Sequence, residues 1–278
     1  MKEVKITSNS GILSGTLFEG YMNKTILVLV SASGVKQKFY KKFATYIAHK
    51  GITVITFDYY GIGRSLEKPI KKLKNNAADW GQNDLESVIQ FIIKNYPNSK
   101  KVALGHSIGG QLIGLAQSSE KLDKIILIGA QSGYWKHWKG ISRLKMWGNW
   151  YVFFPILINL YGYLNSRKIS RMENLPKNVA NQWRNWSKNY NYILSDKSIH
   201  QKYYDKIKVN LTEFSIEDDK LAPLQSVKWM TMQYKNAVKK SIHLRPADYR
   251  INKIGHFGVF KEKFNNTIWQ IILKEIEY

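Results

Sequence analysis

The sequence contains no cysteine among its 278 residues. Disulfides, thiolate metal sites and a cysteine nucleophile are therefore excluded, and any covalent catalysis must use another side chain. Long apolar runs are also missing. The most apolar stretch, Tyr151 to Leu164, has 14 residues and is interrupted by Pro155. Because about 20 apolar residues are needed to cross a bilayer, we interpret this stretch as a buried or interfacial helix.

Acidic residues are scarce, with 20 Asp and Glu against 43 Lys and Arg, which gives a formal net charge of +23. Nucleic-acid binding driven by this charge predicts salt-sensitive retention on DNA. The lysines are scattered, however, and the short clusters Lys71 to Lys74 and Lys239 to Lys240 lack interleaved aromatic residues. We therefore expect no specific nucleic-acid partner. Met1 to Ile6 alternates polar and apolar residues without the apolar core of a signal peptide, so a cytoplasmic location is expected.

What is present is a repeated order of apolar strands and amphipathic helices. A β-branched strand at Thr25 to Val30 precedes a helix at Tyr40 to Lys50 and a second strand at Ile52 to Phe57. A β-hairpin opens the chain at Val4 to Phe18. Such repetition predicts an α/β fold with a mostly parallel, doubly wound sheet. The other predicted strands are Lys101 to Leu104, Lys124 to Ile128, Val209 to Ile216 and Ser241 to Leu244, and the other helices are Asp84 to Tyr96, Ile108 to Gln117, Pro223 to Tyr234 and Lys261 to Ile276.

The strand pattern is interrupted after Gly129. Residues 133–205 are rich in tryptophan and show no buried-strand pattern, so we predict a helical cap insertion there. The core is then formed by residues 1–132 and 206–278. The length suits one α/β domain with one insertion.

The motif that carries chemistry is Gly105-His106-Ser107-Ile108-Gly109, a G-x-S-x-G between a predicted strand and a predicted helix. In this context the motif places a serine on a strained turn, which small neighbours allow to pack tightly. Ser107 is therefore the candidate nucleophile. The alternative, an ordinary glycine-rich turn, does not explain the strand and helix on either side.

A serine hydroxyl needs a base to take its proton. Of six histidines, His256 lies in a glycine-flanked loop between the last strand and the last helix. The order serine, acid, histidine requires a carboxylate after the strand that follows the insertion. Asp219 is favoured there because it lies four residues before Pro223, and Asp218 is the alternative. The carboxylate would orient the imidazole and stabilise its protonated form.

An oxyanion hole needs two N–H groups directed at the tetrahedral intermediate. One is expected from Ile108, the residue after the nucleophile. The other is expected from Gly34 or Val35, after the strand at Thr25 to Val30.

The chain resembles the α/β hydrolase superfamily over nearly its whole length, and Asp58 to Ser65 is similar to its D-x-x-G-x-G-x-S segment. More narrowly, it resembles a bacterial group of predicted α/β hydrolases close to serine aminopeptidase-like and monoglyceride lipase-like members. This resemblance implies an α/β-hydrolase fold in which the insertion forms a lid. Where relatives carry His-Gly after the first core strand, this chain has Ser33-Gly34. The matching segments are Ser33 to Val35, Leu175 to Pro176, Gln182 to Trp186, Glu217 to Asp219 and Ile254 to Gly258.

These features predict a serine hydrolase that cleaves a carboxylic ester or related acyl substrate through an acyl-enzyme, without metal or organic cofactor. An acyltransferase, thioesterase, amidase or peptidase would use the same residues, and a non-catalytic binding module on the same scaffold is a further alternative. Aromatic residues in Tyr134 to Tyr163 would line a pocket for a hydrophobic acyl substrate or pack the insertion onto the core. The stretch Tyr151 to Leu164, beside Lys139, Arg143 and Lys145, would alternatively contact an anionic membrane.

Overall fold

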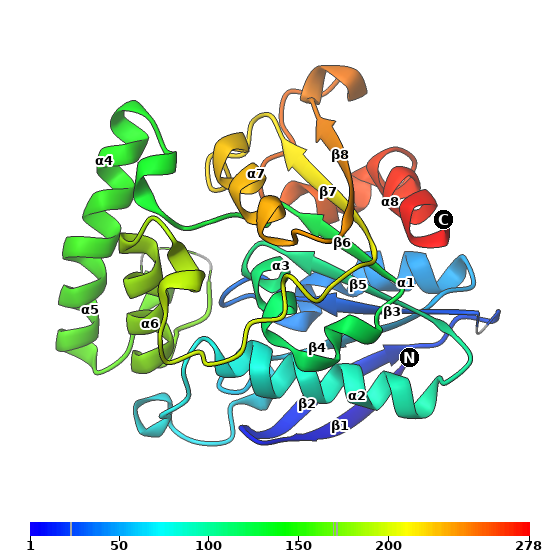
Figure 1. The fold of residues 1–278 in the computed structure, drawn as a ribbon, viewed down its shortest axis with the longest axis horizontal. Helices are drawn as coiled ribbons and strands as arrows, with labels where there is room; N and C mark the ends of the chain where they lie inside the picture. The colour runs from blue at the N-terminus through cyan, green and yellow to red at the C-terminus, as the bar shows by residue number, and fades with distance from the viewer. Residues whose placement is uncertain (23, 169, 171) are drawn as a thin grey trace.

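The computed structural model describes residues 1–22, 24–168, 170 and 172–278, and one eight-stranded sheet forms its centre (Figure 1). The strands are β1 (Lys2–Ser8), β2 (Gly11–Phe18), β3 (Thr25–Val30), β4 (Thr53–Phe57), β5 (Lys100–His106), β6 (Lys124–Ile128), β7 (Asn210–Ile216) and β8 (Val238–Leu244). Their order across the sheet is β1-β2-β4-β3-β5-β6-β7-β8. The β1–β2 and β2–β4 pairs are antiparallel, and the pairs from β4 to β8 are parallel. The predicted hairpin and mostly parallel sheet are confirmed.

Helices cover both faces of this sheet. The side chains of β3 alternate between two cores, since Ile26 and Val28 belong to one cluster and Leu27 and Leu29 to the other. The first face is covered by α2 (Glu86–Asn95), α3 (Ile108–Leu112) and α7 (Leu224–Gln233), and the second by α1 (Lys41–His49) and α8 (Ile268–Glu277). Burial on both faces explains the largely apolar sequences of the central strands β3, β4 and β6.

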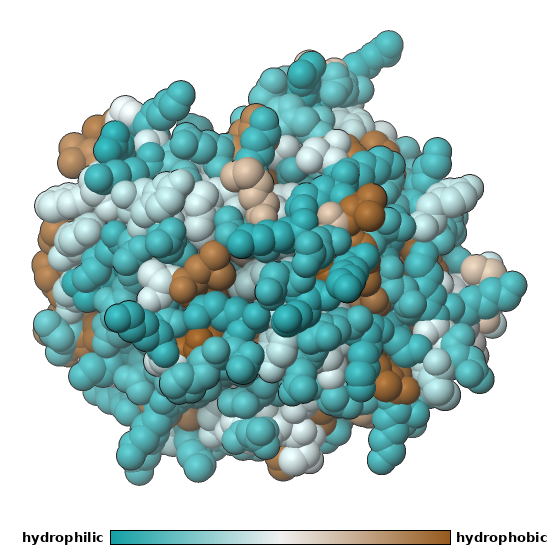
Figure 2. Space-filling model, in the orientation of Figure 1, coloured by the Kyte–Doolittle hydropathy of each residue, from teal (hydrophilic) through white to brown (hydrophobic). Residues whose placement is uncertain are grey.

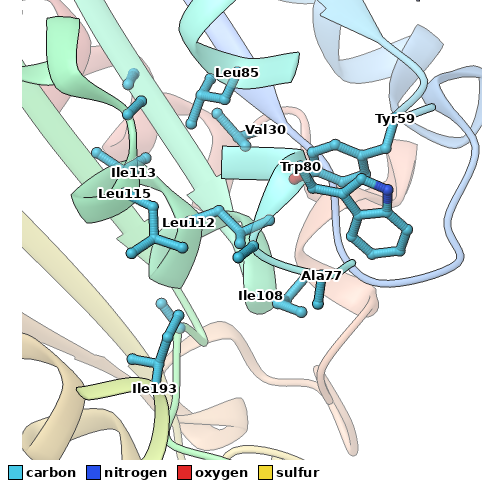
Figure 3. Close-up of a cluster of buried hydrophobic side chains, with 14 of the residues drawn as sticks. Val30, Tyr59, Ala77, Trp80, Leu85, Ile108, Leu112, Ile113, Leu115 and Ile193 are labelled. Carbon is cyan, nitrogen blue, oxygen red and sulfur yellow. The ribbon is translucent and has the colours of Figure 1, made fainter. Parts of the chain in front are cut away.

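The core beneath α3 anchors the turn that carries Ser107. Figure 3 shows Ile108, Leu112 and Ile113 of this region packed near Val30 from β3, together with Ile193 from the insertion. Tyr59 and Trp80 stack nearby with ring centroids 4.7 Å apart. Close packing of this kind leaves little room for the turn to shift.

The insertion at residues 133–205 carries α4 (Gly140–Gly148), α5 (Phe154–Tyr161) and α6 (Lys177–Lys188), which group beside one end of the sheet in Figure 1. Residues 169 and 171 of this segment lie outside the described residues. The insertion bonds to three segments that follow core strands: Glu173 N–H donates to Gly34 O at 2.7 Å, Tyr192 OH to Gln111 Oε1 at 2.9 Å, and Trp138 Nε1–H to Lys220 O at 2.9 Å. It therefore lies over the carboxyl ends of the parallel strands.

Three helices differ from the sequence expectation. The helix expected at Ile108 to Gln117 is α-helical only to Leu112 and continues as a 3₁₀ turn to Leu115, where the Gly114 carbonyl accepts from Tyr203 N–H of the chain that leaves the insertion. The expected final helix begins at Ile268, after two 3₁₀ turns, and α2 begins at Glu86 after a π-helical turn. Among the described residues, no helix is long and apolar enough to cross a membrane.

Candidate active site

Ser107 occupies a strained turn between β5 and α3. Its backbone has φ 55° and ψ −122°, a conformation that L residues rarely adopt. The neighbouring glycines are required by space: a Cβ on Gly109 would lie 2.2 Å from Val30 O, and one on Gly105 would lie 2.4 Å from the Gly110 Cα. The glycines of the motif therefore let the turn fold tightly against β3, as the sequence pattern predicts.

Asp219 and His256 form a buried pair after β7 and β8. His256 Nδ1 lies 2.6 Å from Asp219 Oδ2, and the side chains are 5% and 0% exposed. Because an ionised carboxylate only accepts hydrogen bonds, Nδ1 carries the proton and Nε2 of the neutral ring keeps a free lone pair. Asp219 Oδ1 accepts from the N–H groups of Leu221 and Ala222, at 2.8 and 3.0 Å, which fixes the carboxylate.

Asp218 has a separate task. Its two oxygens accept from Ile254 N–H at 3.1 Å and Gly255 N–H at 2.9 Å. This carboxylate therefore ties down the loop that carries His256 without contacting the imidazole. Of the two acids that sequence reasoning left open, Asp219 is the one that pairs with His256.

The Ser107 hydroxyl points to a residue that the sequence did not single out. It donates to Gln131 Oε1 at 3.3 Å, and the described residues include no hydrogen bond between Ser107 and His256. Both groups nevertheless adjoin the end of β6, since Ser107 N–H donates to Ile128 O and a Cβ on Gly129 would lie 3.3 Å from His256 Nδ1. Gln131 follows β6 by three residues, and one glutamine in a loop gives no sequence signal.

The two amides proposed after β3 differ in availability. Val35 N–H donates to Ala32 O at 3.1 Å and is therefore already engaged in a turn. Gly34 has φ +62°, and its N–H has no acceptor in the part of the chain described. Ile108 N–H belongs to the first turn of α3, where amides lack intrahelical acceptors. Gly34 and Ile108 therefore retain free donors.

His106 connects three loops of the site and was not predicted to do so. Ala32 N–H donates to Tyr40 OH at 3.0 Å, Tyr40 OH lies 2.8 Å from His106 Nδ1, and His106 Nε2 lies 3.0 Å from the His256 carbonyl. Since a carbonyl only accepts, Nε2 carries the proton and Nδ1 accepts from the tyrosine. Burial, followed by the nearby His256, lowers the pKa of His106 well below 6.5, so this ring stays neutral.

A groove of about 1080 Å³ opens between α4 and α7, beside this site. Asp219 and Leu221 belong to its wall, and Leu221 O accepts from Gln131 Nε2 at 3.4 Å. One side chain, Gln131, therefore links the groove wall to the Ser107 hydroxyl. The lining is largely apolar, and its ionisable side chains other than Asp219 are His137, Tyr190 and four lysines. The lining residues used below are Trp138, Lys139, Ile141, Lys145, Lys220, Lys228 and Trp229.

A family model described as serine aminopeptidase, S33, matches residues 22–236. The chain belongs to the serine aminopeptidase S33 family. It is thereby a member of the α/β hydrolase superfamily, as its resemblance indicated. No curated protein sequence matches this S33-family chain.

Solved structures share the fold of this S33-family chain at low sequence identity. A soluble variant of monoglyceride lipase from Saccharomyces cerevisiae is 11% identical, with a TM-score of 0.70 over 99% of this chain and 94% of the lipase chain. The esterase EaEST from Exiguobacterium antarcticum is 15% identical, with a TM-score of 0.61 over all of both chains. XC6422 from Xanthomonas campestris, described as a serine hydrolase without lid, is 12% identical, with a TM-score of 0.55 over 98% and 94%. These likenesses establish the α/β-hydrolase fold.

Proposed function

We propose that this chain is a serine hydrolase that cleaves a carboxylic ester or related acyl substrate. Ser107 is the nucleophile, His256 the base and Asp219 the acid that orients it. The observation that carries the proposal is the 2.6 Å hydrogen bond from His256 Nδ1 to Asp219, beside a serine held at φ 55°. An imidazole with its proton fixed on Nδ1 has Nε2 free to accept the serine proton.

In the reaction, the Ser107 hydroxyl leaves Gln131 and turns toward Nε2 of His256. Its oxygen attacks the acyl carbon, and the proton moves to Nε2. The oxyanion accepts from the N–H groups of Ile108 and Gly34. The imidazolium then protonates the leaving alcohol, and water hydrolyses the acyl-enzyme with His256 again acting as base. This sequence needs neither a metal nor an organic cofactor.

The groove favours an acyl substrate that is neutral or anionic. Trp138, Ile141 and Trp229 would contact a hydrophobic chain, while the groove wall contains lysines on several sides. An aminopeptidase would need a free carboxylate for the substrate ammonium, and the carboxylate among the lining residues, Asp219, is bonded to His256. Within the shared chemistry, we therefore favour ester or thioester cleavage over aminopeptidase activity.

Residues 133–205 are proposed to act as a cap over this site. Their bonds to Gly34, Gln111 and Lys220 reach three segments around Ser107, and Ser107 is 8% exposed. A cover of this kind limits the access of water and selects the substrate. Acyl transfer to an alcohol in place of water is the related activity that such shielding favours, and product analysis with competing alcohols would detect it.

A labelled fluorophosphonate tests the proposal, because it modifies an activated serine. Wild-type protein is expected to incorporate one label at Ser107 and to hydrolyse aryl esters of graded chain length. Ser107→Ala should lose both properties and keep the same melting temperature. If folded wild-type protein takes up no label and Ser107→Ala hydrolyses the esters as fast as wild type, the proposal is refuted.

A further inference from the structure

The helical segment from α4 to α5 is apolar on two opposite sides. Trp150, Phe154 and Ile158 recur every fourth residue and are buried against the core. Val152, Ile156 and Leu160 recur with the same spacing but two residues out of step. Within α5 each residue turns the helix by about 100°, so Ile156 and Leu160 lie roughly 200° from Phe154 and Ile158. The second set therefore faces away from the protein.

This outward side of the helix exposes unusually large apolar side chains for a surface helix. Ile156 and Leu160 are 56% and 69% exposed. Helices at the surface of soluble proteins carry polar residues on the side that faces water. A helix that is apolar on all sides is therefore expected to contact another molecule or a membrane on its exposed side. Hydrophobic side chains appear in brown along the left margin of Figure 2, where α4 and α5 lie in Figure 1. We call this surface the α4–α5 face; its exposed apolar residues are Ile141, Leu144, Trp147, Tyr151, Val152, Phe153, Ile156 and Leu160.

The charged side chains around the α4–α5 face are positive. The sequence has no Asp or Glu between Asp123 and Glu173. Glu173 itself already pairs with Lys36 and Arg167. The exposed cations beside the N-terminal half of the face are Lys136, Lys139, Arg143 and Lys145.

We propose that the α4–α5 face docks on the surface of an anionic lipid bilayer. Apolar side chains would enter the boundary between headgroups and acyl chains, and the cations would contact lipid phosphates. A second copy of this chain is disfavoured as the occupant, because it would bring a like-charged surface against this one, on molecules of net charge +23.

Docking in this orientation would place the groove beside the lipid. Ile141 belongs to both the α4–α5 face and the groove, and Lys139 and Lys145 also line the groove. An amphiphile could therefore pass from the membrane to the groove while its charged end stays near lysine. This step rests on the proposed hydrolase function, whereas binding to the bilayer does not.

Vesicle co-sedimentation tests the proposal, with the Ser107→Ala protein so that no lipid is consumed. We expect binding to vesicles of phosphatidylcholine with 30% phosphatidylglycerol, and much weaker binding to phosphatidylcholine alone. Ile156→Asn/Leu160→Asn should lower the partition coefficient by roughly tenfold or more, and so should Arg143→Glu/Lys145→Glu. All four side chains are exposed, so the melting temperature should change little.

Matched controls use the same changes elsewhere. Leu66 and Val238 are exposed apolar residues outside the face, and Lys94 and Lys121 are exposed cations outside it. Leu66→Asn/Val238→Asn and Lys94→Glu/Lys121→Glu should bind vesicles nearly as wild type does. Equal loss in the controls, no wild-type binding, or a dimer in analytical ultracentrifugation that Ile156→Asn/Leu160→Asn dissociates would overturn the proposal. Loss of fluorophosphonate labelling in wild-type protein with intact vesicle binding would refute only the hydrolase function.

Discussion

At the scale of single residues, two neighbouring carboxylates have different partners and should respond differently to the same substitution. Asp219→Asn removes the acceptor that keeps the proton on Nδ1 of His256, so we expect kcat for ester hydrolysis to fall by roughly 10⁴-fold. Asp218→Asn keeps an oxygen for one of its two backbone donors, so we expect a loss below roughly tenfold. Steady-state kinetics on both variants checks this. A larger loss in Asp218→Asn would reverse the assignment.

Gln131 accepts the hydrogen bond of the Ser107 hydroxyl, and removing this acceptor should free the hydroxyl to turn toward His256. Gln131→Met keeps the size of the side chain but cannot accept this hydrogen bond strongly. Since a hydrogen bond contributes about 0.5–1.5 kcal/mol net, fluorophosphonate labelling should accelerate by roughly two- to tenfold. The rate of fluorophosphonate labelling, compared at equal concentrations of folded wild-type and Gln131→Met protein, measures this acceleration. Slower labelling at an unchanged melting temperature would show that Gln131 instead aligns the serine.

At the scale of elements, the first turn of α3 leaves no space for a side chain at Gly109. Gly109→Ala places a methyl group 2.2 Å from Val30 O, on backbone that cannot move aside easily, so we expect a loss of about 3 kcal/mol in unfolding free energy. Gly148 in α4 is the matched control, because its added methyl would meet Phe153 at 3.4 Å. Gly148→Ala should stabilise by up to about 1 kcal/mol through helix propensity. Denaturant unfolding of both variants measures these changes. An unchanged unfolding free energy in Gly109→Ala would contradict the tight packing.

The π-helical turn before α2 contains a buried acid that makes stability depend on pH. Asp84 accepts from Ser8 and from Tyr60 N–H, yet burial raises its pKa from 3.8 to about 6. Its contribution to stability is thus complete below pH 3.8 and is lost as pH rises through 6. Asp84→Asn cannot ionise; its oxygen can still accept from Tyr60 N–H while its amide group donates to the Ser8 hydroxyl oxygen. Its unfolding free energy, relative to wild type, should rise by up to roughly 3 kcal/mol between pH 4 and 8.

Thermal or urea unfolding over this pH range measures the difference. Asp205→Asn, which changes an exposed carboxyl, serves as the control and should follow the wild-type curve. A constant offset between Asp84→Asn and wild type at all pH values would mean that Asp84 does not titrate in this range.

The central strands β3, β4 and β6 were predictable because burial on both faces demands a largely apolar sequence, and the tight turn at Ser107 was predictable because it demands glycines. Contacts between distant segments were not. The Gly114 carbonyl just after α3 bonds to Tyr203, and the choice between Asp219 and Asp218 depends on which carboxylate reaches the His256 imidazole, since both bond to the loop that carries it. The π-helical turns at Trp80–Leu85 and Asn149–Phe153 likewise leave no periodic signal over so few residues.

At the scale of the whole molecule, a net charge of +23 repels itself in the folded state. Salt screens this repulsion, with a Debye length that shortens from about 30 Å at 0.01 M to about 3 Å at 1 M. We therefore expect the melting temperature to rise by a few degrees, about 3–5 °C, from 0.01 to 0.5 M sodium chloride. Lys94→Glu/Lys121→Glu lowers the net charge by four, to +19, and should weaken this dependence. A melting temperature that falls with salt would show that ion pairs outweigh the repulsion.

The hydrogen bonds through His106 also have a mechanical consequence. The His106 ring accepts a hydrogen bond from Tyr40 OH and donates one to the His256 carbonyl. The Tyr40 oxygen in turn accepts from Ala32 N–H, in the segment after β3. The three loops are thus joined by one chain of hydrogen bonds, and displacement of any one of them would weaken the bonds to the other two. Heating should therefore disorganise them together, in one cooperative step, so that the reactivity of Ser107 and the alignment of its partners disappear over the same few degrees.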